Sequence, residues 1–239
     1  AFDAESRERL IDQVRRFVTE RLRPIEAKVA EADEVPAEVV EEMKALGLFG
    51  LSIPEAYGGL GLSMEDECLV AFELGRTSPA FRSVFGTNVG IGSQGLVMFG
   101  TDEQKAKYLP GVASGEIITS FALTEPEAGS DAGGVRTTAT PTDDGAAYLL
   151  NGVKHYITNG GIADVLTVMA RTPTPDGKGK VTAFLVTPDT PGFEVVEARA
   201  EKCGIRGTAT GKMRFTDVRV PKENVLGQVG RGLQAALRC

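Results

Sequence analysis

The sequence predicts an α+β protein with an all-α N-terminal region, a middle antiparallel β-sandwich or barrel domain, and the start of a C-terminal helical bundle. Apolar residues recur at three- and four-residue steps as far as residue 116, as in amphipathic helices. After Pro110 this period gives way to short β-branched runs separated by turn residues, which is typical of antiparallel sandwiches and barrels. A helical period returns after Gly227. We therefore expect a helical domain over 1–116, a β-domain over 117–227 and the first turns of a truncated helical domain over 228–239.

Several local signals place the helices of the N-terminal region. Pro36 suits a first helical turn and Gly47 a stop. Ser63 can cap a further helix that runs to Leu74. Thr101, with a glutamine three residues later, opens a capping-box pattern. The first helix is predicted by one apolar stripe amid Arg and Glu, which we interpret as core packing: Leu10, Val14, Phe17, Val18, Leu22 and Ile25.

The apolar segment Phe85–Phe99 is unusual because it contains four glycines. Each glycine costs a helix about 1 kcal/mol relative to alanine. Close approach of another helix or of a slender ligand would offset that cost, and both explanations remain open. Gly90–Gly95 also matches the dinucleotide fingerprint Gly-x-Gly-x-x-Gly, but that motif needs a preceding strand and a long following helix. The new helix cap at Thr101 follows too soon, so we exclude a nicotinamide-binding site here.

Short β-rich runs bounded by turn residues predict the strands of the β-domain. The turn signals are Asp143-Asp144-Gly145, Asn151-Gly152, Pro175-Asp176-Gly177 and Pro191-Gly192. The runs are Ile117–Leu123, Val135–Thr140, Tyr148–Val153, Val165–Ala170, Val181–Val186, Phe193–Val196, Met213–Phe215 and Val218–Val220.

Composition excludes several classes of function. The chain has 26 basic and 33 acidic residues, a formal net charge of −7 and no basic block, which argues against nucleic acid or an anionic membrane surface as the main partner. Cys68, Cys203 and Cys239 are odd in number and far apart, so neither a disulfide framework nor a zinc site is indicated and a reducing compartment is the simpler expectation. A single histidine excludes a multi-histidine metal site. There is no run long enough to span a bilayer and no signal-peptide core.

The stretch Ser120–Asp131 carries the first part of a candidate site. Its apolar run stops at Thr124, and Pro126 cannot continue a ladder, so we expect the backbone beyond Leu123 to leave the sheet with its amides unpaired. Free amides near a glycine, together with the hydroxyls of Thr124 and Ser130, suit a polar heteroaromatic ring and a phosphate.

A second stretch, His155–Gly161, has the same design: a β-rich run that ends at Thr158 and is followed by glycines. We predict that the two strand ends meet on one face of a single sheet and hold one flat ligand. Taken singly, these residues have structural explanations. A strand-end threonine is usually a β-former or turn cap, and Glu125 and Glu127 are expected to be solvated loop acids. His155 is expected to hydrogen-bond locally, and its neighbours Lys154 and Tyr156 indicate nothing beyond an alternating strand.

Together the two stretches resemble the acyl-CoA dehydrogenase family, the flavoenzymes that desaturate acyl-CoA thioesters in fatty acid β-oxidation. The resemblance extends from about Ala37 to Cys239 and is nearest to long- and very-long-chain members. It is supported by further motifs in order: Gly58-Gly59-Leu60-Gly61, Phe99–Lys105, Tyr108-Leu109-Pro110, Gly204–Thr208 and Asp217–Gly227.

The resemblance implies FAD as the cofactor. Thr124 would bond the N1/O2 edge of the flavin and Thr158 the N5 region, where fixed donors meet the charge that develops on reduction. Tyr156 would lie where the family usually has tryptophan, Ser130 would face phosphate or the CoA moiety of the substrate, and the glycine-rich segment Phe85–Phe99 would line the acyl tunnel. The full set of implied cofactor-binding residues is Phe121, Ala122, Leu123, Thr124, Gly129, Ser130, Tyr156, Ile157 and Thr158.

The implied reaction removes a proton from the α-carbon and a hydride from the β-carbon of an acyl-CoA, and it needs a carboxylate base. By resemblance that glutamate is expected beyond Cys239, so we nominate no catalytic residue within the chain. Glu125 is rejected as the base because it sits on the flavin side, and residues 1–239 alone are expected to be inactive.

The resemblance also implies an electron-transfer flavoprotein as acceptor, a homodimer or homotetramer, and a bacterial-type cytoplasmic location or, alternatively, a mitochondrial matrix location after processing. Two other functions remain open: a flavin oxidase or monooxygenase on the same fold, and a non-catalytic acyl-CoA-binding module.

Overall fold

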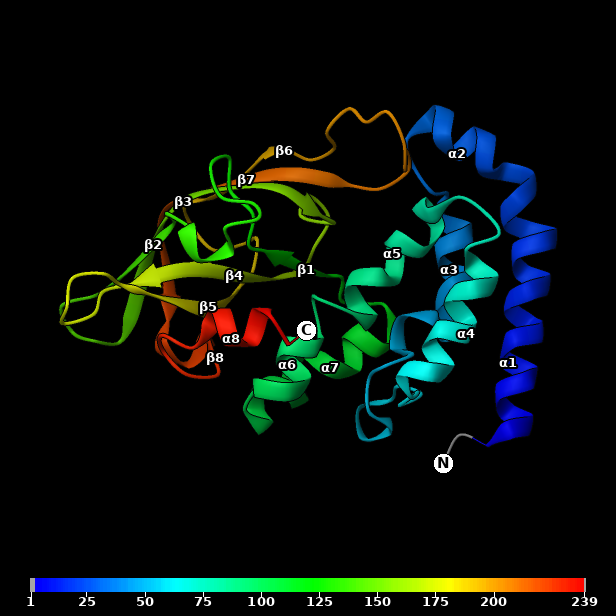
Figure 1. The fold of residues 1–239 in the computed structure, drawn as a ribbon, viewed down its shortest axis with the longest axis horizontal. Helices are drawn as coiled ribbons and strands as arrows, with labels where there is room; N and C mark the ends of the chain where they lie inside the picture. The colour runs from blue at the N-terminus through cyan, green and yellow to red at the C-terminus, as the bar shows by residue number, and fades with distance from the viewer. Residues whose placement is uncertain (1–2, 239) are drawn as a thin grey trace.

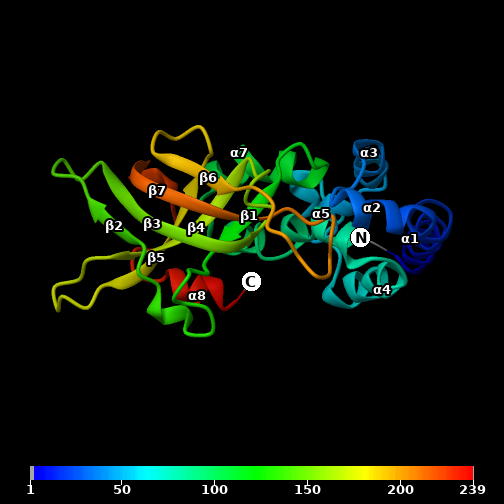
Figure 2. The same ribbon diagram turned by 90° about the horizontal axis from the view of Figure 1, so that it is seen from above.

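The computed structural model describes residues 3–238 as a group of helices beside a strongly twisted β-sheet (Figure 1). Seen from above, α1 to α5 lie together on one side and the strands on the other (Figure 2). The helices are α1 (Ala4–Phe17), α2 (Glu26–Ala32), α3 (Ala37–Ala45), α4 (Met64–Leu74), α5 (Pro79–Val89), α6 (Gln94–Phe99), α7 (Asp102–Ser114) and α8 (Gly232–Ala236). The strands are β1 (Thr119–Ala122), β2 (Thr138–Pro141), β3 (Ala147–Thr158), β4 (Val165–Thr172), β5 (Lys180–Val186), β6 (Phe193–Glu197), β7 (Thr210–Pro221) and β8 (Val225–Leu226).

The predicted order of a helical domain followed by a β-domain is confirmed. The three domain boundaries stay a prediction, and their outermost positions, 1, 2 and 239, lie outside the described residues. None of the helices within residues 3–238 is long and apolar enough to cross a membrane. Cys68 and Cys203 are free and exposed.

Helix capping in the N-terminal region follows the sequence signals. The Ser63 hydroxyl accepts from the amide of Asp66 at the start of α4, and Thr101 forms the predicted capping box with Gln104 at the start of α7. The first apolar stripe is buried as expected, but α1 ends at Phe17. A wider π-helical turn and a short 3₁₀ turn then carry the chain into α2.

The glycine-rich segment Phe85–Phe99 is not one helix. It is broken between α5 and α6 at Gly90, whose φ and ψ are −117° and −125°. Gly92 allows close approach of the next layer, because a Cβ there would lie 2.3 Å from the Thr119 Oγ1 on β1. The close contact at Gly92 therefore involves a strand rather than a helix. A helix, not a strand, precedes Gly90, so the context of a dinucleotide fingerprint is missing.

The sheet is mixed, with strand order β6-β7-β3-β2-β4-β5-β8. Most pairings are antiparallel, but β1 and β2 each pair with β4 in parallel. The two last predicted runs form the single strand β7. The prediction of a turn at Asn151-Gly152 is wrong, because these residues lie at a register shift inside β3, where Gly152 has φ 158° and lies against Thr137.

Both faces of the central strands are covered, so β4 and β5 are nearly continuous runs of buried residues, as expected for strands without a solvent face. Val165 and Met169 on one face of β4 pack against helical residues such as Leu109, and α6, α7 and α8 lie beneath this face (Figure 1). Leu166 and Val168 on the other face join a second core with side chains of β3 and β7.

Two buried asparagines attach the helices to the sheet. Asn88 on α5 donates to the carbonyl oxygens of Val112 and Ile117 and accepts from the amide of Thr119 at the start of β1. Asn159, immediately after β3, donates to the Ser83 and Val84 carbonyl oxygens and to the Thr87 Oγ1 of α5. The ends of β1 and β3 are thereby fixed against the same helix.

Candidate functional site

The candidate site lies between β3 and β4, where one position in the sheet is occupied by two short strands in succession. β1 and β2 both run parallel to β4 and both lie between β3 and β4. Ala122 pairs with Val168, and Thr138 pairs with Arg171, only three residues further along β4. β1 and β2 therefore occupy one position in the sheet, which we call the strand row. The chain between Ala122 and Thr138 leaves this row and returns to it. This segment, the excursion, contains the first predicted stretch from residue 123 onward.

The excursion begins with a tight turn. Glu125 and Ala128 exchange backbone hydrogen bonds, with N–O distances of 2.9 and 3.3 Å. The prediction that the amides beyond Leu123 are left unpaired is therefore wrong for these two residues, because the Pro126 corner brings the chain back on itself. Gly129 and Ser130 follow at the exposed end of the turn, where a Cβ added to Gly129 would meet nothing within 4 Å.

A buried ion pair fills the gap between the ends of β1 and β2. Lys154 on β3 is fully buried and Glu125 is 7% exposed. The lysine Nζ donates to the Glu125 Oε1 at 2.8 Å and to the Leu123 carbonyl oxygen at 2.9 Å. The other partners of the carboxylate are the backbone amides of Arg136 and Thr137, at 2.6 and 2.9 Å. These two amides directly precede β2, so the Glu125 side chain satisfies donors that the interrupted strand row would otherwise leave unpaired.

The surroundings shift the pKa of both partners. Burial lowers the pKa of Lys154 to about 8, an effect that the bond and charge of Glu125 partly oppose. Burial alone would raise the pKa of Glu125, but the hydrogen bonds from Lys154, Thr137 and Arg136 outweigh it and hold that pKa below its ordinary value of 4.5. The expectation that Glu125 is a solvated acid is thus wrong, as is the interpretation of Lys154 as an ordinary strand residue. Glu127 is exposed as predicted and pairs with Arg136 at the surface.

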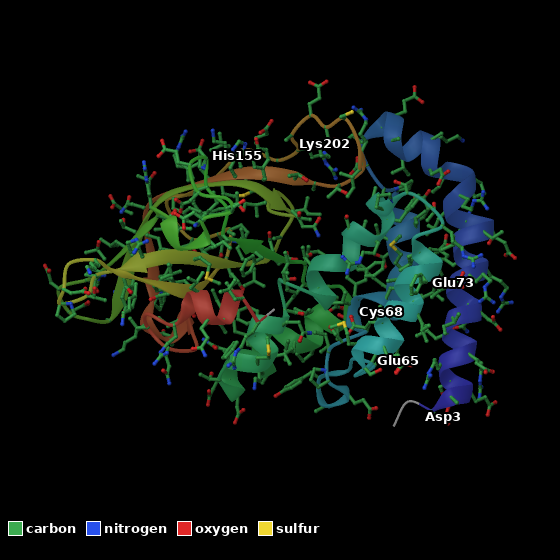
Figure 3. All side chains as sticks on the ribbon, viewed as in Figure 1. Asp3, Glu65, Cys68, Glu73, His155 and Lys202 are labelled. Atoms are coloured by element: carbon green, nitrogen blue, oxygen red, sulfur yellow. The ribbon has the colours of Figure 1, made fainter. Side chains whose placement is uncertain are left out.

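The second predicted stretch is the irregular end of β3. The register with β7 shifts between Lys154 and Ile157, and Tyr156 has φ 58°. The bulge breaks the alternation of the strand, so Lys154 and Ile157 are both buried while Tyr156 is 65% exposed. The imidazole of His155 stacks on Tyr156 with ring centroids 3.9 Å apart. Figure 3 shows His155 on the side of the sheet that carries β3 and β7. One face of the Tyr156 ring is therefore occupied.

The structure brings the two predicted stretches together. The amide of His155 donates to the Thr124 carbonyl oxygen at 2.9 Å, and the Ser120 hydroxyl donates to the Thr158 carbonyl oxygen at 2.7 Å. The two segments therefore run antiparallel beside each other. Thr124 lies opposite His155, three positions before Thr158, and the bulge at Tyr156 lies between these two positions of β3.

Thr158 also opens into a cavity of about 220 Å³ between β3 and α5. The rest of its lining comes from α5 and the two residues that follow this helix. It comprises small residues, one cation and one isoleucine: Arg82, Ser83, Gly86, Thr87, Gly90 and Ile91. The glycine-rich segment thus meets one of the two predicted strand-end hydroxyls.

The remaining predicted residues contribute in different ways. Ala122 is fully buried in the sheet core, and Ile157 is buried there too. Phe121 and Leu123 are half-buried and pack toward the core beneath the sheet. Any contact of Ala122 or Ile157 with a ligand would therefore have to involve the backbone, whereas Phe121 and Leu123 keep part of their surface exposed.

Sequence reasoning missed four residues that build this site: Asn88, Glu125, Lys154 and Asn159. One of them had a recognisable signal. Asn159 precedes two glycines and adopts φ 59°, a left-handed conformation that asparagine tolerates better than most residues. The partners of the other three come from distant parts of the chain, and no local pattern indicated them.

Comparison with known proteins identifies the family. The sequence profile of the acyl-CoA dehydrogenase N-terminal domain matches residues 4–116, and that of the middle domain matches residues 120–218. An acyl-CoA dehydrogenase of Bacillus subtilis is 38% identical over 224 residues, covering 94% of this chain and 58% of that protein. The very long-chain specific mitochondrial acyl-CoA dehydrogenase of Macaca fascicularis is 41% identical over 235 residues, covering 95% of this chain and 35% of that protein.

Among solved structures, an acyl-CoA dehydrogenase from Bacillus anthracis complexed with FAD superposes with a TM-score of 0.88 at 36% identity, covering 98% of this chain and 40% of that one. The chain therefore spans between about a third and three fifths of the length of these relatives. Because two domain profiles in the expected order account for nearly all of its residues, the chain belongs to the acyl-CoA dehydrogenase family.

Proposed function

We propose that these residues serve in an FAD-dependent acyl-CoA dehydrogenase that introduces an α,β double bond into an acyl-CoA thioester. One observation carries the proposal. Thr158 lines the cavity beneath the glycine-rich face of α5, and its backbone is bonded to the strand that ends beside Thr124. Hydroxyl donors at two neighbouring strand ends and a narrow cavity alongside them are what a flat cofactor and a slender acyl substrate require.

The residues present fit an isoalloxazine ring. Thr124 and Thr158 are half-buried rather than enclosed in the core, Tyr156 offers an exposed aromatic surface, and the turn at Gly129 is open. The residues that we propose to contact FAD are the strand-end set given above, with Thr124 toward the N1/O2 edge and Thr158 toward N5. When bound, FAD would supply the acceptor for the hydride that leaves the β-carbon.

The chain itself would contribute binding, orientation and exclusion of water. Thr124 and Thr158 would present fixed donors where negative charge develops. The helix α5 would cover the reacting carbons and hold the acyl chain along Gly86 and Gly90, and Ser130 would bond the phosphate or CoA part of the ligand. Glu125 would not act as the base, because its carboxylate is already occupied by Lys154 and two backbone amides. As the family resemblance implies, we propose that the base lies outside residues 1–239.

The test uses the full-length protein as purified. It is expected to be yellow, and anaerobic addition of acyl-CoAs of increasing length should bleach the flavin absorbance, with the strongest response for long-chain substrates. Residues 1–239 alone should bleach with none of them. A full-length protein that carries no flavin would defeat the proposal, and turnover by residues 1–239 would refute the position of the base.

Two other functions are distinguished by the same preparation. A flavin oxidase or monooxygenase would consume oxygen without an artificial electron acceptor, whereas a dehydrogenase would need the acceptor. A non-catalytic acyl-CoA-binding module would bind the thioester without loss of flavin absorbance.

We further propose an electron-transfer flavoprotein as the acceptor, a homodimer or homotetramer as the assembly, and a cytoplasmic location of the bacterial type. Reduction of a purified electron-transfer flavoprotein by the substrate-reduced enzyme would test the first of these. A monomeric mass for the full-length protein in solution would contradict the second, and the third is checked by fractionation of the source cells.

A further inference from the structure

Within the strand row that contains the candidate site, the gap between β1 and β2 is bridged by a buried ion pair rather than by a regular ladder. Between the end of β1 and the start of β2 the chain makes its excursion, so backbone pairing is lost along that part of β3 and β4. Lys154 lies on β3 at this level and its ammonium group bonds the Leu123 carbonyl oxygen and the Glu125 carboxylate. The carboxylate in turn bonds the amides of Arg136 and Thr137 on the far side of the gap.

Thr124 lies within this network of hydrogen bonds around Lys154 and Glu125. Its two chain neighbours, Leu123 and Glu125, are both bonded to Lys154, and its own carbonyl oxygen accepts from the amide of His155. Three consecutive residues of the first stretch are thus tied to two consecutive residues of β3. The same part of β3 continues through the bulge at Tyr156 to Thr158, so one pair sets the position of Thr124 relative to Thr158.

Stability alone does not account for a buried pair at this place. Replacing a buried ion pair with well-packed apolar side chains is often neutral or stabilising, because removing two charges from water is costly. What a lysine and a glutamate provide, and a leucine pair would not, is directional bonding to a carbonyl oxygen on one side of the gap and two amides on the other.

We propose that Lys154 and Glu125 are positioning residues that fix the spacing of the two strand-end hydroxyls, and through it the affinity and reduction potential of the flavin. This inference rests on the proposed function. Neither residue is proposed to contact substrate or to transfer a proton; both act through Thr124.

The experiment compares variants of the full-length protein. In the double variant Lys154→Met/Glu125→Gln both charges are removed, so no uncompensated charge stays buried and the melting temperature should fall less than in Lys154→Met alone. We expect FAD to bind about tenfold more weakly and the midpoint potential to become more negative, because the donors that favour the reduced ring are displaced. FAD affinity is measured from the fluorescence of released flavin and the potential by dye-coupled reduction.

The matched control is Glu127→Gln, which removes a charge from the same excursion but breaks only the surface pair with Arg136. It should leave both FAD affinity and potential unchanged. Glu125→Asp is the milder companion variant, because it keeps the charge and shortens the side chain by one methylene. It should weaken FAD binding and shift the potential in the same direction, by less than the double variant.

The outcomes separate the two proposals. A wild-type protein without flavin would defeat the proposed function itself. A yellow wild type whose double variant and Glu125→Asp variant both retain the wild-type FAD affinity and potential would overturn the positioning role alone. Should the double variant not fold, Glu125→Asp decides: an unchanged potential overturns the inference, and a shifted potential at an unchanged melting temperature supports it.

Discussion

At the end of β1 the backbone is fixed by a buried ion pair, whereas at the end of β3 it is fixed by a neutral asparagine in a left-handed conformation. The two ends have the same design in sequence, a β-rich run that stops at a threonine and leads into glycines. Lys154 reaches across from a neighbouring strand to hold the first end, while Asn159 reaches out from the second end to α5. The comparison shows that two similar strand ends can depend on different forces, so pH and substitution should affect them unequally.

The largest effect on stability is expected when one partner of the buried Lys154–Glu125 pair is replaced and the other keeps its charge. Lys154→Met leaves the Glu125 carboxylate buried without its cation, which typically costs about 3–5 kcal/mol. We expect a loss of this size in the free energy of unfolding, measured by urea titration of the full-length protein. Adding Glu125→Gln to the same variant should recover much of it. If Lys154→Met alone were as stable as the wild type, the buried ion pair would not contribute to stability.

Replacement of Asn159, the neutral residue that bonds the end of β3 to α5, should have the next largest effect on stability. Asn159→Ala removes three donated bonds to α5 and places a Cβ at φ 59° without a compensating side chain, so we expect a loss of about 2–4 kcal/mol. Asn159→Gly is the control, since glycine tolerates this φ and should be about 1 kcal/mol less destabilising than alanine. Equal losses for the two variants would mean that the left-handed backbone contributes nothing to the difference.

The hydroxyls at the two ends should affect the ligand more than the fold. Thr124→Val and Thr158→Val keep the shape of the side chain, so the free energy of unfolding of the apoprotein should change little. Each variant should weaken FAD binding or slow flavin reduction by about 1–3 kcal/mol, the value of one lost donor. Titration of the apoprotein with FAD and stopped-flow reduction measure the two effects. Unchanged values for either variant would remove that threonine from the site.

A smaller and pH-dependent effect should be confined to the charged end. Because the pKa of Glu125 lies below its ordinary value of 4.5 in the folded protein, the unfolded chain binds the proton more readily. The contribution of Glu125 to stability is therefore fully present above about pH 4.5 and is lost as the pH falls through the lowered folded pKa. Urea titrations between neutral and acidic pH should show this loss in the wild type and less of it in Glu125→Gln. Parallel pH profiles would contradict the assignment.

The smallest effect is expected at the surface of the same excursion. Glu127 and Arg136 form an ion pair between well-exposed side chains, and such pairs contribute about 0–1 kcal/mol. Glu127→Gln should therefore leave the free energy of unfolding within about 0.5 kcal/mol of the wild type. A larger loss would show that the excursion depends on its surface as well as on its buried pair.

Several features were predictable from sequence because they depend on near neighbours. The caps at Ser63 and Thr101, the apolar stripe of α1 and most of the strands follow from periodicity and from hydrogen bonds between residues three or four apart. The pairing of the two threonine-bearing strand ends was also predicted correctly at the level of neighbouring segments.

Other features depended on contacts that no local pattern encodes. The parallel placement of β1 and β2 in one row, and the register shift that absorbs Asn151-Gly152, arise from pairing with β4 and β7. Glu125 and Lys154 are 29 positions apart, and each on its own looks like a residue that belongs in water. Only the fold removes water from both at once.

The sequence alone determined the family, the alternation of helical and β regions and the two hydroxyl-bearing strand ends, because these features depend on the chemistry of residues that are close together in the sequence. Tertiary structure decided how those ends are held. The burial of a charge, and the partner that makes its burial tolerable, depend on which distant segments exclude water from it.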